Sequence, residues 1–324
     1  MTFVRKVAVC VLFAFTTAAM PANAQTYPNR IVKVVAPNPP GGAGDLLARM
    51  FGTYFAEKTG QSVVIENVTG AAGNLAMEAV AKSPPDGYSI VLVNNTMITV
   101  NPFLFKNMRV DPFKDLVPVA AIGDAPQLLF VNSKVPAKNL DEFLAMAKAT
   151  PGKISYASPG IGTTPHLSCG QIGQRKDVNL LHVPYRGVVP AITDIVAGHV
   201  NAMCVSYSVT KRFVENGTMR ALVTLTPKRV PYLPDVPTAD EVGLKGLHMG
   251  TWFGLFVPTG TPQSVIDTIN AHVRGMLNDP ESLKKLKLSE IDPMPMTAAE
   301  YAAFVKSEIP KYEQAVKAAG ITAK

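Results

Sequence analysis

Ile31-Val32-Lys33-Val34-Val35, followed by Pro37-Asn38-Pro39-Pro40-Gly41-Gly42-Ala43-Gly44-Asp45, is the stretch that says most about the fold. The apolar β-branched run predicts a strand. After Asp45, apolar residues recur at helical spacing up to Gly60. A strand that enters a helix through a glycine turn directs the free N–H groups of the first helical turn at whatever lies above the strand end. The stretch therefore predicts either an anion-binding cradle, with Asp45 at the helix start, or a plain tight turn.

Strand-like and helix-like runs alternate along the rest of the chain, which predicts an α/β fold with parallel sheets covered by helices. The expected strands are 62–66, 89–94, 128–131, 154–157, 180–183, 200–205, 221–224 and 252–257, and the expected helices are 140–149, 191–197, 264–277 and 298–319. The length suggests two domains. No flexible linker separates them, so we expect ordinary strands near 120–131 and 252–257 to cross between two hinged lobes. One lobe would hold residues 25–125 and 248–324, and the other would hold residues 126–247.

The first 24 residues have the pattern of a secretory signal peptide. Arg5 and Lys6 precede an apolar run, and Ala22-Asn23-Ala24 supplies the small residues of a cleavage site. We therefore expect an exported chain that begins at Gln25 after cleavage behind Ala24. Charges and prolines interrupt every later apolar run, so no transmembrane segment is expected.

Charge and cysteine content restrict the partners. The net charge is +7, and removing the two cations of the signal peptide leaves +5, which mildly favours anionic ligands. Lysines and arginines are scattered without a basic cluster, which argues against nucleic acid. Cys169 and Cys204 are the cysteines of the mature chain. A bridge between them is possible in an oxidising compartment, but we predict two small buried thiols.

A second strand, glycine loop and helix unit occurs in the middle of the chain. The strand 154–157 leads into Ser158-Pro159-Gly160-Ile161-Gly162-Thr163-Thr164 and then Pro165-His166. Hydroxyls and free N–H groups would make this loop a neutral, donor-rich pocket for a carboxylate, with Thr163 or Thr164 as the helix cap. His166 has two alternatives, donation to an anion or packing against the sheet.

Three further strand ends carry polar groups. They are His182-Val183-Pro184-Tyr185-Arg186-Gly187, Ser206-Tyr207-Ser208, and Thr96 with Thr99 in the loop after Asn94-Asn95. Ligands of open α/β sheets bind outside the carboxyl ends of the strands, which favours these positions. Arg186 is either a bidentate carboxylate partner or a solvated loop residue. Each hydroxyl is either a ligand contact or a local cap.

Enzyme motifs are incomplete. Tyr156-Ala157-Ser158-Pro159-Gly160 resembles a nucleophile elbow but lacks its first glycine. Gly42-Ala43-Gly44 begins a dinucleotide fingerprint, yet Leu47 stands where the third small residue belongs. The histidines and cysteines show no metal-ligand spacing. We therefore expect no catalytic residue, no cofactor and no metal. A secreted hydrolase that uses Ser158 and a receptor-like sensor subunit stay as alternatives.

Several motifs then occur together and in a characteristic order. They are Pro37-x-Pro39-Pro40-Gly41-Gly42-x-x-Asp45, Pro85-Asp86-Gly87-Tyr88, Tyr156-Ala157-Ser158-x-Gly160-x-Gly162-Thr163, His182-Val183-Pro184-Tyr185-Arg186-Gly187, Leu233-Pro234-Asp235-Val236-Pro237-Thr238 and Pro258-x-Gly260-Thr261-Pro262. This order resembles the Bug-type receptors, the extracytoplasmic solute-binding proteins of tripartite tricarboxylate transporters. The resemblance implies a periplasmic, monomeric Venus flytrap of two α/β lobes. It would hold a small organic carboxylate in its cleft and deliver it to a membrane permease.

The resemblance also assigns the binding residues by position. The first-lobe set is Pro40, Gly41, Gly42, Asp45, Thr96 and Thr99, and the second-lobe set is Ser158, Gly160, Gly162, Thr163, His166, Tyr185, Arg186 and Gly187. The chain departs from the family at Asn38, where phenylalanine is usual, and at Ser206-Tyr207, where an Asp-Asn pair is usual. These three residues are therefore expected to contact the ligand and to change which ligand is selected.

Overall fold

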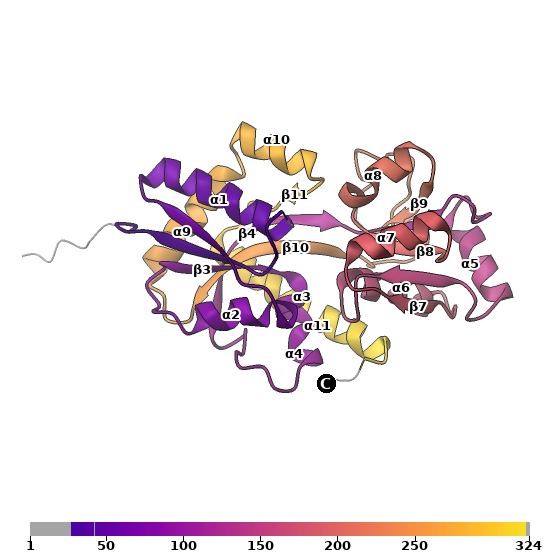
Figure 1. Cartoon of the computed structure of the whole chain (residues 1–324), viewed down its shortest axis with the longest axis horizontal. Coiled ribbons are helices and arrows are strands. Elements are labelled where there is room, and N and C mark those ends of the chain that lie inside the picture. Colours follow the sequence, from indigo (N-terminus) through magenta and orange to yellow (C-terminus); the bar gives the residue numbers. More distant parts are fainter. Residues whose placement is uncertain (1–26, 42, 322–324) are drawn as a thin grey trace, which may run out of the picture.

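The computed structural model describes residues 27–41 and 43–321, so the predicted signal peptide lies outside the described residues. Two lobes lie side by side along the long axis of the molecule (Figure 1). Each lobe contains one sheet with helices on both faces, as expected from the alternation of strand-like and helix-like runs. In the described part of the chain, no helix has both the length and the apolar character needed to cross a membrane.

Lobe 1 is built on a six-stranded sheet with the order β11-β4-β10-β3-β1-β2. Its strands are β1 (Val32–Ala36), β2 (Val63–Asn67), β3 (Ser89–Asn94), β4 (Leu116–Pro126), β10 (Gly250–Pro258) and β11 (Asp292–Pro293). Side chains alternate between the two faces, so Val34 packs with α1 (Ala43–Thr59) and α9 (Gln263–Met276). Its neighbour Val35 packs on the other face with α2 (Asn74–Ala81) and the start of α11 (Ala298–Ala318). Both faces of this sheet are therefore buried.

Lobe 2 is built on a five-stranded sheet with the order β7-β6-β8-β5-β9. Its strands are β5 (Leu128–Asn132), β6 (Ser155–Ser158), β7 (Leu181–Pro184), β8 (Ala202–Val205) and β9 (Met219–Thr224). One face packs with α5 (Leu140–Ala149) and α6 (Thr164–Arg175), and the other packs with α7 (Val188–Ala197) and α8 (Tyr207–Glu215). The expected α/β two-lobe architecture is thus confirmed.

Both sheets are mixed, whereas the sequence suggested mostly parallel ones. In lobe 1, β10 runs antiparallel to β3 and β4, and in lobe 2, β5 runs antiparallel to β8 and β9. The cause is the crossing between lobes. A chain that leaves lobe 1 on β4 must come back on β10, so the two crossing strands run in opposite directions and pair with each other.

The crossing itself is held by backbone hydrogen bonds. Gln127 N donates to Met249 O (3.2 Å), Leu225 N donates to Gln127 O (2.8 Å), and Met249 N donates to Leu225 O (2.9 Å). The crossings therefore fall near residues 126–128 and 249–250, inside or beside the expected stretches. A third connection was not expected. Helix α11 starts against lobe 1 but ends with Tyr312 and Val316 in the core of lobe 2 (Figure 1).

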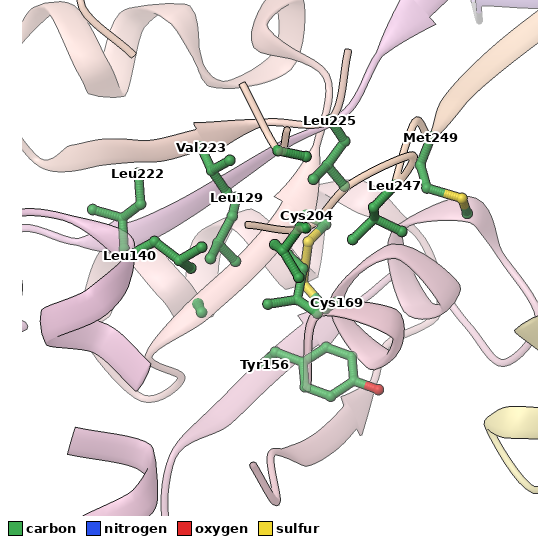
Figure 2. Close-up of a cluster of buried hydrophobic side chains, with 14 of the residues drawn as sticks. Leu129, Leu140, Tyr156, Cys169, Cys204, Leu222, Val223, Leu225, Leu247 and Met249 are labelled. Carbon is green, nitrogen blue, oxygen red and sulfur yellow. A yellow bond between two sulfur atoms is a disulfide. The ribbon is translucent and has the colours of Figure 1, made fainter. Parts of the chain in front are cut away.

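Cys169 of α6 and Cys204 of β8 form a disulfide bond in the core of lobe 2 (Figure 2). The prediction of two separate thiols is therefore wrong. The bond joins residues 35 positions apart, with a Cα–Cα distance of 5.6 Å. Helix α6 lies across β8, which brings the two side chains together among Leu129 and Tyr156. Sequence spacing carries no information about that packing.

Four short or peripheral helical elements complete the chain. They are η1 (Ala71–Gly73), α3 (Asn95–Thr99), α4 (Asn101–Leu104) and α10 (Pro280–Leu288). The expected helices 140–149, 191–197, 264–277 and 298–319 correspond to α5, α7, α9 and α11 within three residues at each end. The eight expected strands also occur, each shifted by at most two residues at either end.

Candidate ligand-binding cleft

A cleft of about 540 Å³ lies where the two lobes face each other. Lobe 1 and the crossing strands line it with Asn38, Ala43, Leu46, Asn94, Thr96, Ala125, Gln127, Thr251, Phe253, Ser289 and Ile291, and lobe 2 lines it with Pro159, Thr163, Thr164, Pro165, Val188, Val205, Ser206, Ser208 and Val209. The lining consists of equal numbers of apolar and neutral polar residues. Its volume suits a ligand the size of a small organic acid.

Four helices of eight or more residues begin at this cleft. Ala43 is the first residue of α1, Thr163 is the N-cap of α6, Val188 is the first residue of α7, and Ser206 is the N-cap of α8. The side chains of Thr163 and Ser206 make no capping hydrogen bond. The first N–H groups of a helix lack partners within the helix and carry a partial positive charge. Their convergence from both lobes favours an anion in the cleft.

Asp45 holds the lobe 1 loop in place. Its buried carboxylate accepts hydrogen bonds from Gly41 N (3.0 Å), Arg49 Nε (2.9 Å) and Asn67 Nδ2 (2.9 Å). The bond from Arg49, and then those from Gly41 and Asn67, lower the pKa of Asp45 to about 2 despite its burial. Asn67 Nδ2 also donates to the backbone oxygen of Asn38 (2.8 Å). Asp45 therefore stabilises the loop by hydrogen bonds on the side away from the cleft, and it does not line the cleft.

The other predicted residues of lobe 1 divide into two groups. Asn38 and Thr96 line the cleft, and the Thr96 hydroxyl donates to Asn94 Oδ1 (2.7 Å). Pro40 and Gly41 are exposed outside the lining, and Thr99 is buried with its hydroxyl donating to Asn95 O (2.8 Å). Gly42 lies outside the described residues. Six of the seven predicted lobe 1 positions are therefore described, and two of these six, Asn38 and Thr96, line the cleft.

Asn38 is oriented by its neighbour Gly44. The side-chain oxygen Oδ1 lies against Gly44, buried and without a hydrogen-bond partner among the described residues. Any side chain at position 44 would collide with this amide, so the helix start and Asn38 fit only with glycine there. Because Oδ1 is covered, Nδ2 is the end of the amide that is left to meet a ligand.

The β6–α6 loop of lobe 2 is stabilised by Ser158. This residue is fully buried, and its hydroxyl lies 2.6 Å from His182 Nε2, donates to Gly160 O (3.0 Å) and accepts from Gly160 N (3.2 Å). The Thr163 hydroxyl donates to the same Gly160 oxygen (2.7 Å) while Thr163 lines the cleft. Ser158 and Gly160 therefore stabilise the loop on the side away from the cleft, and Thr163 lies on the side that faces the cleft.

His166 lies on the far side of this loop. Its Nδ1 accepts from Gly162 N (3.1 Å), and its ring stacks on His182 with a centroid distance of 3.8 Å. Burial lowers the pKa of both rings to about 4, so both are neutral at neutral pH. They line a separate pocket of about 560 Å³ beside Tyr156 and the end of α11. The two alternatives for His166 were donation to an anion and packing against the sheet, and in the structure the ring packs against the sheet residues Tyr156 and His182.

The β7–α7 loop contributes through its backbone. Tyr185 donates its hydroxyl to Asp194 Oδ2 (2.6 Å) on α7, and burial and then this contact raise the pKa of the phenol to about 12. Arg186 is exposed and does not line the cleft. Gly187, at φ +117°, donates its N–H to Pro159 O (3.2 Å) and precedes Val188. This bond ties the loop to the neighbouring β6–α6 loop.

The fourth strand end places one of its two predicted residues in the cleft. Ser206 lines it together with Ser208, and the two hydroxyls are 3.2 Å apart. Tyr207 turns inward and stacks on Tyr232 at 4.7 Å. Adjacent residues at a strand end point in opposite directions, which explains why only one of the pair reaches the ligand space.

Sequence reasoning missed much of the lining. Gln127, Thr251, Phe253, Ser289, Ile291, Leu46, Val188 and Val209 line the cleft without having been predicted as contacts. The first three lie on or between the crossing strands, which were expected to join the lobes. Strands that cross between two lobes form the floor of the cleft between them. This rule could have identified Gln127, Thr251 and Phe253 as lining residues. Ser289 and Ile291 follow α10 and carry no such signal.

Comparisons with known proteins agree with this architecture. Residues 47–321 match the family described as "Tripartite tricarboxylate transporter family receptor". The chain is 36% identical to the "UPF0065 protein in tcbD-tcbE intergenic region" of Pseudomonas sp. (strain P51), covering 96% of this chain and 93% of that protein. It is 31% identical to "Protein BugT" of Bordetella pertussis (strain Tohama I), covering 99% of both chains.

Solved structures give the same result. "R. palustris Rpa4515 with adipate" is 32% identical, with a TM-score of 0.82, and the match covers 92% of this chain and 100% of that one. "MatC (Rpa3494) from Rhodopseudomonas palustris with bound malate" is 32% identical, with a TM-score of 0.76, covering 90% and 100%. "Structure of periplasmic binding protein BugD" is 34% identical, with a TM-score of 0.77, covering 92% and 100%. The protein is a periplasmic solute-binding receptor and not an enzyme, and it belongs to the receptor family of the tripartite tricarboxylate transporters.

Proposed function

We propose that the protein captures a small organic carboxylate between its lobes and delivers it to the membrane permease of a tripartite tricarboxylate-type transporter. The observation that carries this proposal is the convergence of four helix N-termini, two lobes and neutral hydrogen-bonding side chains on one cleft. The relatives with adipate and with malate bound support the ligand class.

Ligand capture then works by a shift between open and closed states. A carboxylate touches both lobes at once only when they close, so it stabilises the closed state by its difference in affinity for the two states. The backbone donors at the helix starts are fixed by Asp45 on lobe 1 and by Ser158 on lobe 2. Fixed donors lose little conformational freedom on binding, which favours affinity.

The proposed contacts follow from the lining. Asn38, Thr96, Thr163 and Ser206 supply side-chain groups, and the starts of α1, α6, α7 and α8 supply backbone N–H groups. Among the other predicted residues, the ones that hold these loops are Asp45, Ser158, Gly160, Tyr185 and Gly187. We also propose that the signal peptide is cleaved after Ala24, that residues 25–125 with 248–324 and residues 126–247 form the two lobes except for the end of α11, which packs into lobe 2, and that the receptor is a monomer. The intact mass of the periplasmic protein and its light-scattering mass test the first and the last.

A thermal-shift screen tests the ligand class. Purified protein is heated with mono-, di-, tri- and aromatic carboxylates, and at least one is expected to raise the melting temperature. No shift with any of them would refute the proposal. Native mass spectrometry of freshly purified protein is expected to identify a retained acid.

Ser206→Ala tests the site. The Ser206 hydroxyl contacts only Ser208 Oγ among the described residues, so its loss leaves the fold intact. A hydrogen bond to a charged group contributes about 1.5 to 3 kcal/mol, so affinity is expected to fall about tenfold to a hundredfold. Ser307→Ala, on the exposed face of α11, is the matched control and should change nothing. Unchanged affinity in Ser206→Ala for every carboxylate that binds would remove Ser206 from the site.

A further inference from the structure

Helix α10 ends at a residue whose backbone conformation favours glycine. Glu290 N donates to Lys287 O (3.1 Å) and Ile291 N donates to Leu286 O (3.0 Å), which is the hydrogen-bond pattern of a Schellman motif. Glycine is usual at the position that Glu290 occupies in this motif, because φ is positive there, and φ of Glu290 is +50°. A residue with a Cβ is disfavoured in this conformation. The glutamate therefore indicates a use for its side chain.

The side chain of Glu290 contacts the opposite lobe. Its Oε1 lies 3.6 Å from Nζ of Lys211 on α8, and the glutamate side chain is 9% exposed whereas the lysine side chain is 48% exposed. Helices α8 and α10 lie on the same side of the molecule, one in each lobe, and α11 connects the lobes on the other side (Figure 1). Within residues 27–41 and 43–321, the pair of Lys211 and Glu290 is the one ion pair that joins the two lobes.

The charges around Glu290 come from both lobes. Burial raises the pKa of its carboxyl above the ordinary value, and Lys211 offsets part of this rise. Asp292 of β11 raises this pKa further, whereas Lys287 of α10 lowers it. On the side of lobe 2, burial, then Asp292 and Glu290, raise the pKa of the Tyr232 phenol. Lobe 2 therefore faces Glu290 with one cation, Lys211, which favours the ionised form of the carboxyl.

The ion pair lies beside the cleft without lining it. Ser289 and Ile291, on either side of Glu290 in the chain, both line the cleft. Lys211 lines a groove of about 470 Å³ between α7 and α8, and this groove shares Val188 with the cleft. A movement that separates the lobes would take Lys211 away and leave a largely covered carboxylate without its partner. An unpaired charge in such a place is costly, so the pair favours lobes that stay together.

Resting on the lobe closure of the proposed function, we propose that Glu290 and Lys211 form an electrostatic latch that stabilises the closed arrangement of the two lobes. The latch raises the fraction of molecules that are closed. The apparent dissociation constant equals the intrinsic one divided by the binding-competent fraction, so the latch strengthens ligand binding without touching the ligand. Glu290 and Lys211 are thus positioning residues.

Isothermal titration calorimetry of single variants at neutral pH tests the latch. Adipate is the probe, and malate replaces it if adipate does not bind. Lys211→Met and Glu290→Gln each break the ion pair, so both are expected to weaken binding by about twofold to fivefold, the range that a partly exposed ion pair provides. A long-range effect on an anionic ligand would have opposite signs in the two variants, because loss of the negative charge would strengthen binding. Binding to Glu290→Gln that equals or exceeds binding to the wild type overturns the proposal.

A double variant and a matched control complete the titration. Lys211→Met combined with Glu290→Gln is expected to bind no more weakly than either single variant, because the two groups act as one pair, and additive losses contradict the latch. The control is Glu78→Gln combined with Lys82→Met. Glu78 Oε1 lies 2.6 Å from Lys82 Nζ, the glutamate side chain is 15% exposed, and both residues belong to α2 and its C-terminal cap in lobe 1. The control should leave the affinity unchanged, and a similar loss there overturns the proposal.

Glu290→Gly tests the argument from the backbone. Glycine adopts a φ of +50° without strain, so this variant is expected to melt at or above the melting temperature of Glu290→Gln while it binds the probe equally weakly. A melting temperature below that of Glu290→Gln contradicts the inference that the glutamate serves the ion pair at the expense of the helix end.

A measurement without ligand separates the latch from the proposed function. Spin labels attached to Glu57→Cys on α1 and Lys148→Cys on α5, both exposed positions, report the distance between the lobes by pulsed electron paramagnetic resonance. Adding Glu290→Gln is expected to shift the distance distribution to longer distances. An unchanged distribution overturns the latch, whereas failure of every carboxylate in the thermal-shift screen overturns the proposed function. The two failures are thus distinguishable.

Discussion

Removal of the disulfide gives a stability change that can be worked out in advance. The perturbation is the double substitution Cys169→Ala with Cys204→Ala. The bond closes a span of 35 residues between α6 and β8. For a loop of that length, the chain-entropy relation gives a loss of about 13 cal/mol/K in the unfolded state, or about 4 kcal/mol at 25 °C. The substitutions are therefore expected to lower the free energy of unfolding by about 4 kcal/mol.

Guanidinium denaturation measures this difference. Oxidised protein, protein reduced in the unfolded state and the double variant are compared, and the last two should unfold at the same lower denaturant concentration. Ellman's reagent added to denatured mature protein without reductant is expected to titrate no thiol. Two titrated thiols, or a stability difference below about 1 kcal/mol, would refute the reasoning.

Three further perturbations test other parts of the structure. Burial, then the neighbouring Asp292, raises the pKa of Asp124 from 3.8 to about 7, so its protonated form stabilises the fold below its ordinary pKa. That contribution, on the order of 4 kcal/mol at most, is lost as pH rises to about 7. Asp124→Asn should therefore flatten the dependence of the melting temperature on pH in this range. An unchanged slope in the variant contradicts the raised pKa of Asp124. Asn95 is fully buried and its Nδ2 donates to Thr164 Oγ1 of lobe 2 (3.2 Å). Asn95→Ala should cost roughly 2 to 4 kcal/mol in urea unfolding, and a cost under about 0.5 kcal/mol speaks against a stabilising role for this bond between the lobes. Gly162 has φ +80° and its missing Cβ would collide with Leu104 of lobe 1, so Gly162→Ala should lower the melting temperature by several degrees; an unchanged melting temperature counts against this fit.

Local signals were enough to place most elements of the fold. Helix α5 begins after Asn139, whose side chain accepts from Glu142 N (2.9 Å), and it ends before Pro151-Gly152. The glycine loops after β1 and β6 also lie where the sequence predicted them. These features depend on residues close together in the chain, so the sequence contains all that is needed to predict them.

Side-chain direction at the cleft could not be predicted in the same way. Asn38, Thr96, Thr163 and Ser206 line it, whereas Ser158 and His166 face the rear of their loop. All of these residues follow a strand end. The rule that ligands bind beyond the carboxyl ends of the strands identifies the loop, but it does not say which side chains of the loop face the ligand. Ser158 and His166 turn away from the cleft because both contact His182 of the neighbouring strand β7, and that contact depends on how β6, α6 and β7 pack together. Tertiary packing, in this case of α6 across β8, also determines the disulfide.

The order of strands in the two sheets also has a consequence for folding. All strands of lobe 2 lie between residues 128 and 224, so its sheet is complete before β10 has been made or exported. In lobe 1, β10 pairs with β3 on one side and β4 on the other, so the sheet stays in two pieces until residue 258 is available. A chain that emerges from its N-terminus therefore completes the sheet of the later lobe first. Until residue 258 is available, β3 and β4 each expose an unpaired edge, and unpaired strand edges favour aggregation.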